Sequence, residues 1–180
     1  MTTNVSDPHD PWSEKWRRFR VRPPEDRALI LRAALLLPLT EVGLRALGFQ
    51  RCKQLAEKLF LPAPPSATLS PALQREAALR ILRAVRSAEL HGPAHPNCLE
   101  RSMTLWWMLR RRGVEGELHI GARKEAARFE AHAWVELRGE VLNDSAEVHA
   151  HYARFDAPLA AAAGSVIATE ADLRASRSTD

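Results

Sequence analysis

Residues 96–113 constrain the fold most, because they predict a helix that is apolar over most of its circumference. Asn97 and Glu100 have the spacing of a capping box, so the helix is expected to begin at Cys98. Gly113, which follows three arginines, is typical of a helix end. The apolar residues leave no broad polar face for solvent: Leu99, Met103, Leu105, Trp106, Trp107, Met108 and Leu109. We therefore expect a buried central helix.

The residues before this helix predict further helices. Apolar side chains recur at helical spacing over residues 26–60, and we expect two helices there with a break near Gly48. Another helix is expected over residues 71–90, with Ser70 as its N-cap and Pro71 at its first position.

Beyond Gly113 the pattern changes from helical to alternating. Residues 118–122 and 131–137 each alternate apolar and polar side chains, which predicts two strands with one face in the core. A turn of three residues, Arg138, Gly139 and Glu140, then leads into a returning strand over residues 141–144. The predicted fold class is α+β, with a central helix packed on a small antiparallel sheet and an N-terminal helical region.

A chain of 180 residues is expected to form one domain with appendages. We place an N-terminal arm at residues 1–26, the domain at 27–156 (helical over 27–92, catalytic helix and sheet over 96–156) and a C-terminal tail at 157–180. The arm carries a cluster of basic and aromatic residues between Trp12 and Arg20. We expect these aromatics to pack on the domain; binding of a peptide or nucleic acid is the alternative.

Composition excludes several classes of protein. Hydrophobic residues at 46% and charged residues at 27% are typical of a globular protein. The net charge of +4 is small and spread along the chain, so no nucleic-acid partner is expected. Arg32 and Pro38 interrupt the longest apolar stretch, residues 28–39, which is too short to span a membrane. No secretory signal pattern opens the chain, so the expected compartment is the cytoplasm.

The two cysteines differ in their expected roles. They are too far apart for a paired metal motif, and in a reducing compartment both are expected to be free thiols. Cys98 is expected in the first turn of a helix, where unpaired N–H groups and the helix dipole stabilise a thiolate. Cys52 lies within an apolar helical pattern and is expected to be an inert structural thiol. Cys98 is therefore the candidate nucleophile.

A cysteine nucleophile needs a base and a residue that orients the base. His132 lies on the strand face opposite its apolar neighbours, and Asp144 lies on the next strand. A three-residue turn, or a bulge with the same effect, would place Trp134 opposite Asp144 and put the histidine and the aspartate on one face, ~7–8 Å apart at the backbone. A two-residue turn would put them on opposite faces, and Asp156 or Glu147 would then be considered as the orienting residue.

A metal site is an alternative, because histidines are frequent after residue 90. Their spacings do not repeat a known zinc pattern, so we expect neither a metal nor another cofactor. The candidate ligands are His91, His95, Cys98, His119, His132, His149 and His151.

The same residues carry a resemblance to a known family. Over about residues 28–155 the chain resembles the transglutaminase-like leader peptidases of lasso-peptide biosynthesis, the B proteins of those pathways. The residues that carry the resemblance are Asn97 to Ser102 with Cys98 among them, 105–113, Ile120, Gly121, His132, Ala133, Trp134, Val135, Glu136, Gly139, Asn143 and Asp144.

The resemblance implies a cysteine protease that removes the leader from a ribosomally synthesised precursor peptide, so that a separate ATP-dependent lasso cyclase can act on the core. It implies that Cys98, His132 and Asp144 form the triad. Some members carry an N-terminal leader-recognition domain. Residues 1–26 are too short for one, so we expect the split form, which relies on a separate small leader-binding protein.

Two other functions remain open. A transglutaminase or other acyl transferase would use the same thiol and base but pass the acyl group to an amine instead of water. A non-catalytic scaffold would present the leader without cleaving it, and its nucleophile position would tolerate alanine.

Overall fold

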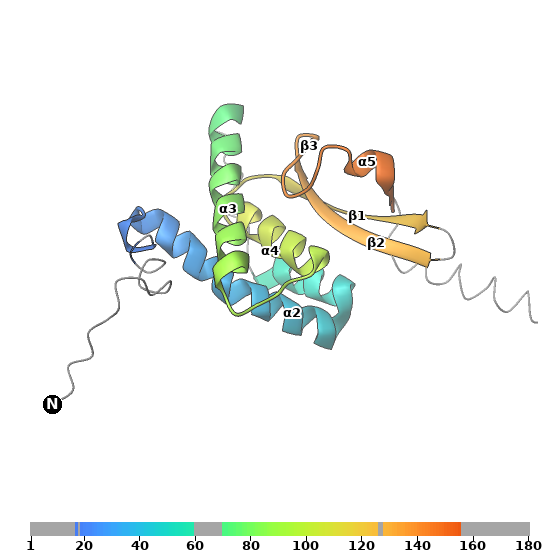
Figure 1. Cartoon of the computed structure of the whole chain (residues 1–180), viewed down its shortest axis with the longest axis horizontal. Helices are drawn as coiled ribbons and strands as arrows, with labels where there is room; N and C mark the ends of the chain where they lie inside the picture. The colour runs from blue at the N-terminus through green and yellow to red at the C-terminus, as the bar shows by residue number, and fades with distance from the viewer. Residues whose placement is uncertain (1–16, 18, 60–69, 126–127, 156–180) are drawn as a thin grey trace, which may run out of the picture.

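The computed structural model describes residues 17, 19–59, 70–125 and 128–155 (Figure 1). Most of the N-terminal arm, including Trp12 and Trp16, and the predicted tail over 157–180 lie outside the described residues, so the predicted domain boundaries stay predictions. The elements are α2 (Pro24–Leu59), α3 (Pro71–His91), α4 (Cys98–Arg110), β1 (Gly116–Glu125), β2 (Arg128–Leu137), β3 (Glu140–Val141), α5 (Val148–His151) and β4 (Ala153–Arg154).

The N-terminal helices follow the predicted pattern. Gly48 has a φ of 75°, so α2 is two helical segments joined at a kink, which confirms the predicted break. Ser70 caps α3 by accepting a hydrogen bond from the N–H of Leu73 at 3.4 Å, and Pro71 takes the first helical position. Among the described residues, no helix has both the length and the apolar character needed to cross a membrane.

Helix α4 begins and ends where the sequence predicts. The side chain of Asn97 accepts from the N–H of Glu100 at 3.0 Å, and the Glu100 carboxylate accepts from the N–H of Asn97 at 2.9 Å. Gly113 has a φ of 69°, and the N–H of Val114 donates to Leu109 O at 3.1 Å. Local capping chemistry therefore sets both ends of this helix.

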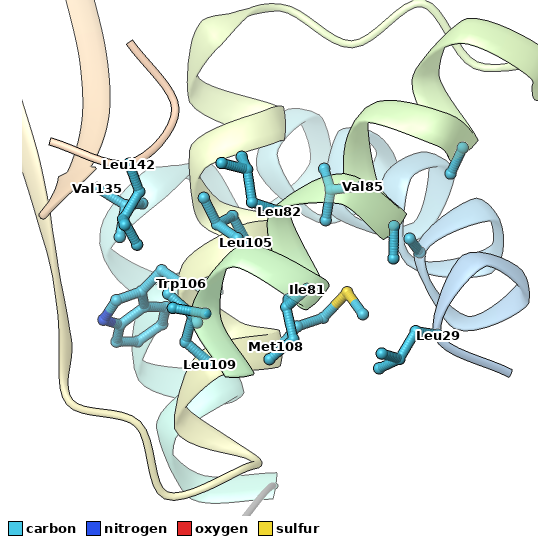
Figure 2. Packing of buried hydrophobic residues seen from close by; sticks show 14 of the residues in the cluster. Leu29, Ile81, Leu82, Val85, Leu105, Trp106, Met108, Leu109, Val135 and Leu142 are labelled. Atoms are coloured by element: carbon cyan, nitrogen blue, oxygen red, sulfur yellow. The ribbon is translucent and has the colours of Figure 1, made fainter. Parts of the chain in front are cut away.

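Helix α4 lies between the other long helices and the sheet (Figure 1). Figure 2 shows that Ile81, Leu82 and Val85 from α3 pack on one side of α4, while Val135 and Leu142 approach from the sheet side. Its apolar side chains pack on both sides and make it the centre of the core, as the sequence predicts. The buried α4 side chains in that core are Leu105, Trp106, Met108 and Leu109.

The four strands form an antiparallel sheet in the order β3-β2-β1-β4. Val135 and Leu137 face the helices, but the other face of β2 is buried as well: Trp134 is 0% exposed and Glu136 is 3% exposed. The prediction of a single buried face is therefore wrong for β2. Residues of α5 and β4 cover the second face, since His149 and Arg154 both contact Glu136.

The hairpin between β2 and β3 differs from the prediction. Leu137 pairs with Glu140, which leaves only Arg138 and Gly139 in the turn, with φ values of 54° and 81°. Positive φ at both turn positions matches the twist of the flanking strands, and this favours the two-residue turn over the predicted three-residue one. The returning strand is also shorter than predicted, because β3 ends at Val141 and the next three residues form a bend.

Candidate functional site

Helix α4 presents Cys98 at its first helical position, directly after the Asn97 cap. The thiol is free and half-buried. The four N–H groups at the start of an α-helix have no partner within the helix, and they favour negative charge beside them. This position suits a thiolate nucleophile.

Cys52 lies inside α2 and is also a free, half-buried thiol. Burial raises the pKa of the Cys52 thiol. A raised pKa keeps the sulfur protonated, which makes it a poor nucleophile. This agrees with the structural role predicted for it.

The structure brings His132 and Asp144 into direct contact, Nε2 of the ring to Oδ2 of the carboxylate. Burial works to raise the pKa of Asp144, but the hydrogen bonds from His132 and from the N–H of Ser145, at 2.7 Å, outweigh it and the pKa is lowered. Because the carboxylate takes Nε2, the other ring nitrogen, Nδ1, is left to meet a thiol proton. The arrangement can orient a general base.

The contact between His132 and Asp144 forms in the two-residue hairpin register, in which the two side chains were expected to lie on opposite faces. With a two-residue turn, His132 and Asp144 would project from opposite faces of a regular hairpin. The chain instead leaves the ladder after Leu142, whose N–H still donates to Val135 O at 2.9 Å. The predicted pairing of Trp134 with Asp144 is therefore wrong, although the side chains of His132 and Asp144 meet as expected.

The beginning of α4 lies close to this pair. Arg101, one turn into the helix, carries a positive charge that is among the causes lowering the pKa of Asp144, after the burial and hydrogen-bond effects already described. Ser102 donates from its hydroxyl to Ala133 O, next to His132, at 2.8 Å. The first two turns of the Cys98 helix are therefore fastened beside the His132 and Asp144 pair.

An aromatic residue that the sequence argument did not identify covers the histidine ring. Tyr152 stacks on His132 with ring centroids 4.8 Å apart, and its hydroxyl donates to Glu130 at 3.0 Å. The guanidinium of Arg123 also lies over the Tyr152 ring, 5.2 Å from its centre. Tyr152 is the one tyrosine in the sequence, and this was the signal that could have drawn attention to it. The stack restricts the orientations that the imidazole can take.

Glu136 lies on the same face of β2 as His132 and is the centre of a buried polar cluster. Its carboxylate accepts from Trp134 Nε1 at 2.6 Å and from Arg154 at 2.5 Å. His149 and His119 lie 3.3 Å and 3.7 Å from it. Burial works to raise the pKa of Glu136, but the bond from Trp134 and the neighbouring positive charges lower it. This cluster connects side chains of α5 and β4 to the second buried face of β2.

The histidines considered as metal ligands do not gather into a site in the described part of the chain. No three side chains of His, Cys, Asp or Glu there are arranged to hold a metal ion. The arginine at position 154 already occupies the Glu136 oxygen that His149 approaches. The cluster is an ion-pair network between protein side chains.

A family model described as the transglutaminase-like superfamily matches residues 39–156, about two thirds of the chain. The matched range contains Cys98, His132 and Asp144, and the α+β arrangement agrees with the predicted fold class. No curated protein and no solved structure matches the chain. The chain belongs to the transglutaminase-like superfamily, which includes cysteine proteases and acyltransferases.

Proposed function

We propose that this protein is a cysteine peptidase in which Cys98 is the nucleophile, His132 the general base and Asp144 the residue that orients the base. The observation that carries the proposal is the contact between His132 Nε2 and Asp144 Oδ2. It holds the ring with Nδ1 available, while the nucleophile candidate stands at the start of the adjacent helix. A thiol, a base and an orienting carboxylate are what acyl transfer to cysteine requires.

In the proposed reaction, His132 Nδ1 accepts the thiol proton as Cys98 Sγ attacks the scissile carbonyl carbon. The unpaired N–H of Cys98 donates to the oxyanion that forms. The C–N bond breaks, the departing amine takes the proton from His132, and a thioester remains. Water, deprotonated by the same imidazole, then hydrolyses the thioester to a carboxylic acid and restores the thiol.

The substrate in this proposal is the precursor of a lasso peptide, and the bond cleaved joins its leader to its core. The support is the combination of the Cys98 helix start, Ser102, and the segment from His132 to Glu136, which resembles the leader peptidases of that pathway. The freed core amine would pass to a separate lasso cyclase in the cytoplasm. A small leader-binding protein would deliver the precursor, and adding it to enzyme and precursor should raise the cleavage rate by raising the local substrate concentration.

The decisive experiment compares Cys98→Ala with Cys52→Ala on a lasso-peptide precursor that contains both leader and core. Mass spectrometry should show cleavage by the native chain and by Cys52→Ala, and a loss of at least about 10³-fold in Cys98→Ala. In isotopically labelled water, one heavy oxygen should enter the new carboxylate of the leader. Cleavage that survives in Cys98→Ala would overturn the peptidase proposal, and transfer of the leader to an added amine would replace it with an acyl transferase.

A further inference from the structure

We propose that Ser102 and Asn143 are positioning residues: together they end the β2–β3 ladder, turn Asp144 toward His132 and dock the Cys98 helix at the same place. The inference rests on the proposed roles of Cys98, His132 and Asp144. Neither residue touches the reacting atoms in this proposal, so each acts through the triad.

The hairpin register shows why such a device is needed. Leu137 pairs with Glu140, Glu136 with Val141, and the N–H of Leu142 still donates to Val135 O at 2.9 Å. One and two steps further along the same ladder, Trp134 would face Asn143 and Ala133 would face Asp144. Paired residues in a sheet project from the same face, and alternate residues project from opposite faces. A regular hairpin would therefore point Asp144 away from His132.

The side chain of Asn143 interrupts that ladder. A hydrogen-bonded antiparallel pair exchanges two bonds, so the N–H of Val135 would ordinarily donate to the carbonyl of Leu142. It donates to Asn143 Oδ1 at 2.8 Å instead. The amide oxygen thus stands in for a strand carbonyl, and the backbone is released to bend one residue before Asp144.

Ser102, in α4, makes two further hydrogen bonds that link Asn143 to β2. Asn143 Nδ2 donates to Ser102 Oγ at 2.8 Å, and Ser102 Oγ donates to Ala133 O at 2.8 Å. Ala133, like Val135 and Leu137, directs its backbone groups toward the edge of β2 where β3 runs. Because β3 has ended there, the serine hydroxyl supplies a partner that the strand does not.

These bonds connect the residues next to His132 and Asp144 with a residue on the Cys98 face of α4. Ser102 lies four residues after Cys98 and so shares its helix face, Ala133 follows His132, and Asn143 precedes Asp144. Ser102 is 0% exposed and Asn143 is 9% exposed, so water cannot easily replace either partner. The hydrogen bonds of the Asn143 amide and the Ser102 hydroxyl therefore fix α4, His132 and Asp144 relative to one another.

The test compares Asn143→Ala and Ser102→Ala with Thr104→Val. Thr104 is a matched control because it also carries a buried hydroxyl in α4, bonded at 3.0 Å to Thr40 of α2 and not to the sheet. The first readout is the imidazole ¹⁵N spectrum of His132, which needs no substrate. In the native chain the neutral ring should carry its proton on Nε2, bonded to Asp144; Asn143→Ala should lose this tautomer preference, and Thr104→Val should retain it.

The second readout is precursor cleavage. We expect Asn143→Ala to lower kcat on the order of 10²-fold with little change in KM, because misplacement of catalytic groups slows the chemical step. Ser102→Ala should cause a smaller loss of the same kind, and Thr104→Val should keep the native kcat even where it lowers Tm. Because Asn143 acts in part through Asp144, the double variant Asn143→Ala with Asp144→Asn should lose less activity than the product of the two single losses.

Two results would overturn the inference: a folded Asn143→Ala or Ser102→Ala that keeps the native tautomer of His132, or losses in the double variant that multiply. Should Asn143→Ala fail to fold, Ser102→Ala decides with the same two readouts. The spectrum is independent of peptidase activity, so failure of the proposed function, seen as cleavage by Cys98→Ala, is distinguishable from failure of the positioning role.

Discussion

His132 Nε2 contacts Asp144 Oδ2, although regular continuation of the two-residue hairpin would place the two side chains on opposite faces of β2. The carboxylate is half-buried and its pKa is lowered: burial opposes ionisation, and the bonds from His132 and Ser145 more than compensate. In the proposed mechanism, an ionised carboxylate at this position would hold the imidazole and stabilise the imidazolium formed when the thiol is deprotonated.

Replacing Asp144 with asparagine should therefore slow cleavage without unfolding the protein. An amide at this position can hold the wrong tautomer, and we expect kcat to fall by about 10⁴-fold. Steady-state kinetics on the precursor measures this. Glu117→Gln is the control, because it removes a carboxylate 3.3 Å from another histidine of the same sheet, His119. A native rate in Asp144→Asn would remove Asp144 from the mechanism.

The second prediction concerns the pH dependence of stability and Glu136. Burial alone would raise the pKa of this carboxyl, but the bond from Trp134 and the charges of His119 and Arg154 lower it below its usual ~4.3. The ionised group therefore stabilises the fold above that pH, and this contribution is lost as the pH falls through the folded-state pKa.

Glu136→Gln should consequently lower Tm at pH 7 and have a shrinking effect toward pH 3. We expect a loss of about 1–3 kcal/mol at pH 7, since a charged acceptor of several buried bonds is removed. Each kcal/mol corresponds to ~2–4 °C for a protein of this size. Glu140→Gln serves as the control: the bond from Arg75 lowers the pKa of Glu140 too, but the pair is exposed and solvent screens it. Equal Tm differences at pH 7 and pH 3 would contradict the assignment.

The third prediction concerns the helix start that carries Cys98. Asn97 accepts from the N–H of Glu100 at 3.0 Å, so Asn97→Ala should reduce the free energy of unfolding by about 1 kcal/mol. Asn97→Gly should reduce it by only about a few tenths of a kcal/mol, because glycine tolerates the cap conformation and leaves the N–H groups open to water. Urea denaturation of the three proteins measures both. An Asn97→Ala variant as stable as the native chain would show that the cap bond does not stabilise this helix.

The sequence alone determined the elements whose causes are local. The cap at Asn97, the termination at Gly113 and the break at Gly48 follow from residues within one or two turns of each other, and the structure confirms all three. The α+β class followed from the change of periodicity after Gly113, because helical and alternating patterns depend on the side chains of each segment. The order of Cys98, His132 and Asp144 along the chain was readable in the same way.

Only the tertiary structure decided the register and the surroundings of the histidine. Arg138 adopts a backbone φ of 54°, which residues other than glycine rarely do, so turn propensity did not reveal the two-residue hairpin. The second buried face of β2 depends on α5 and β4, which are short elements with weak local signals. Asn143 and Ser102 are 41 residues apart and bond only once α4 has packed on the sheet. Their hydrogen bonds replace those of the ended strand, and this long-range exchange of partners is what lets Asp144 reach His132.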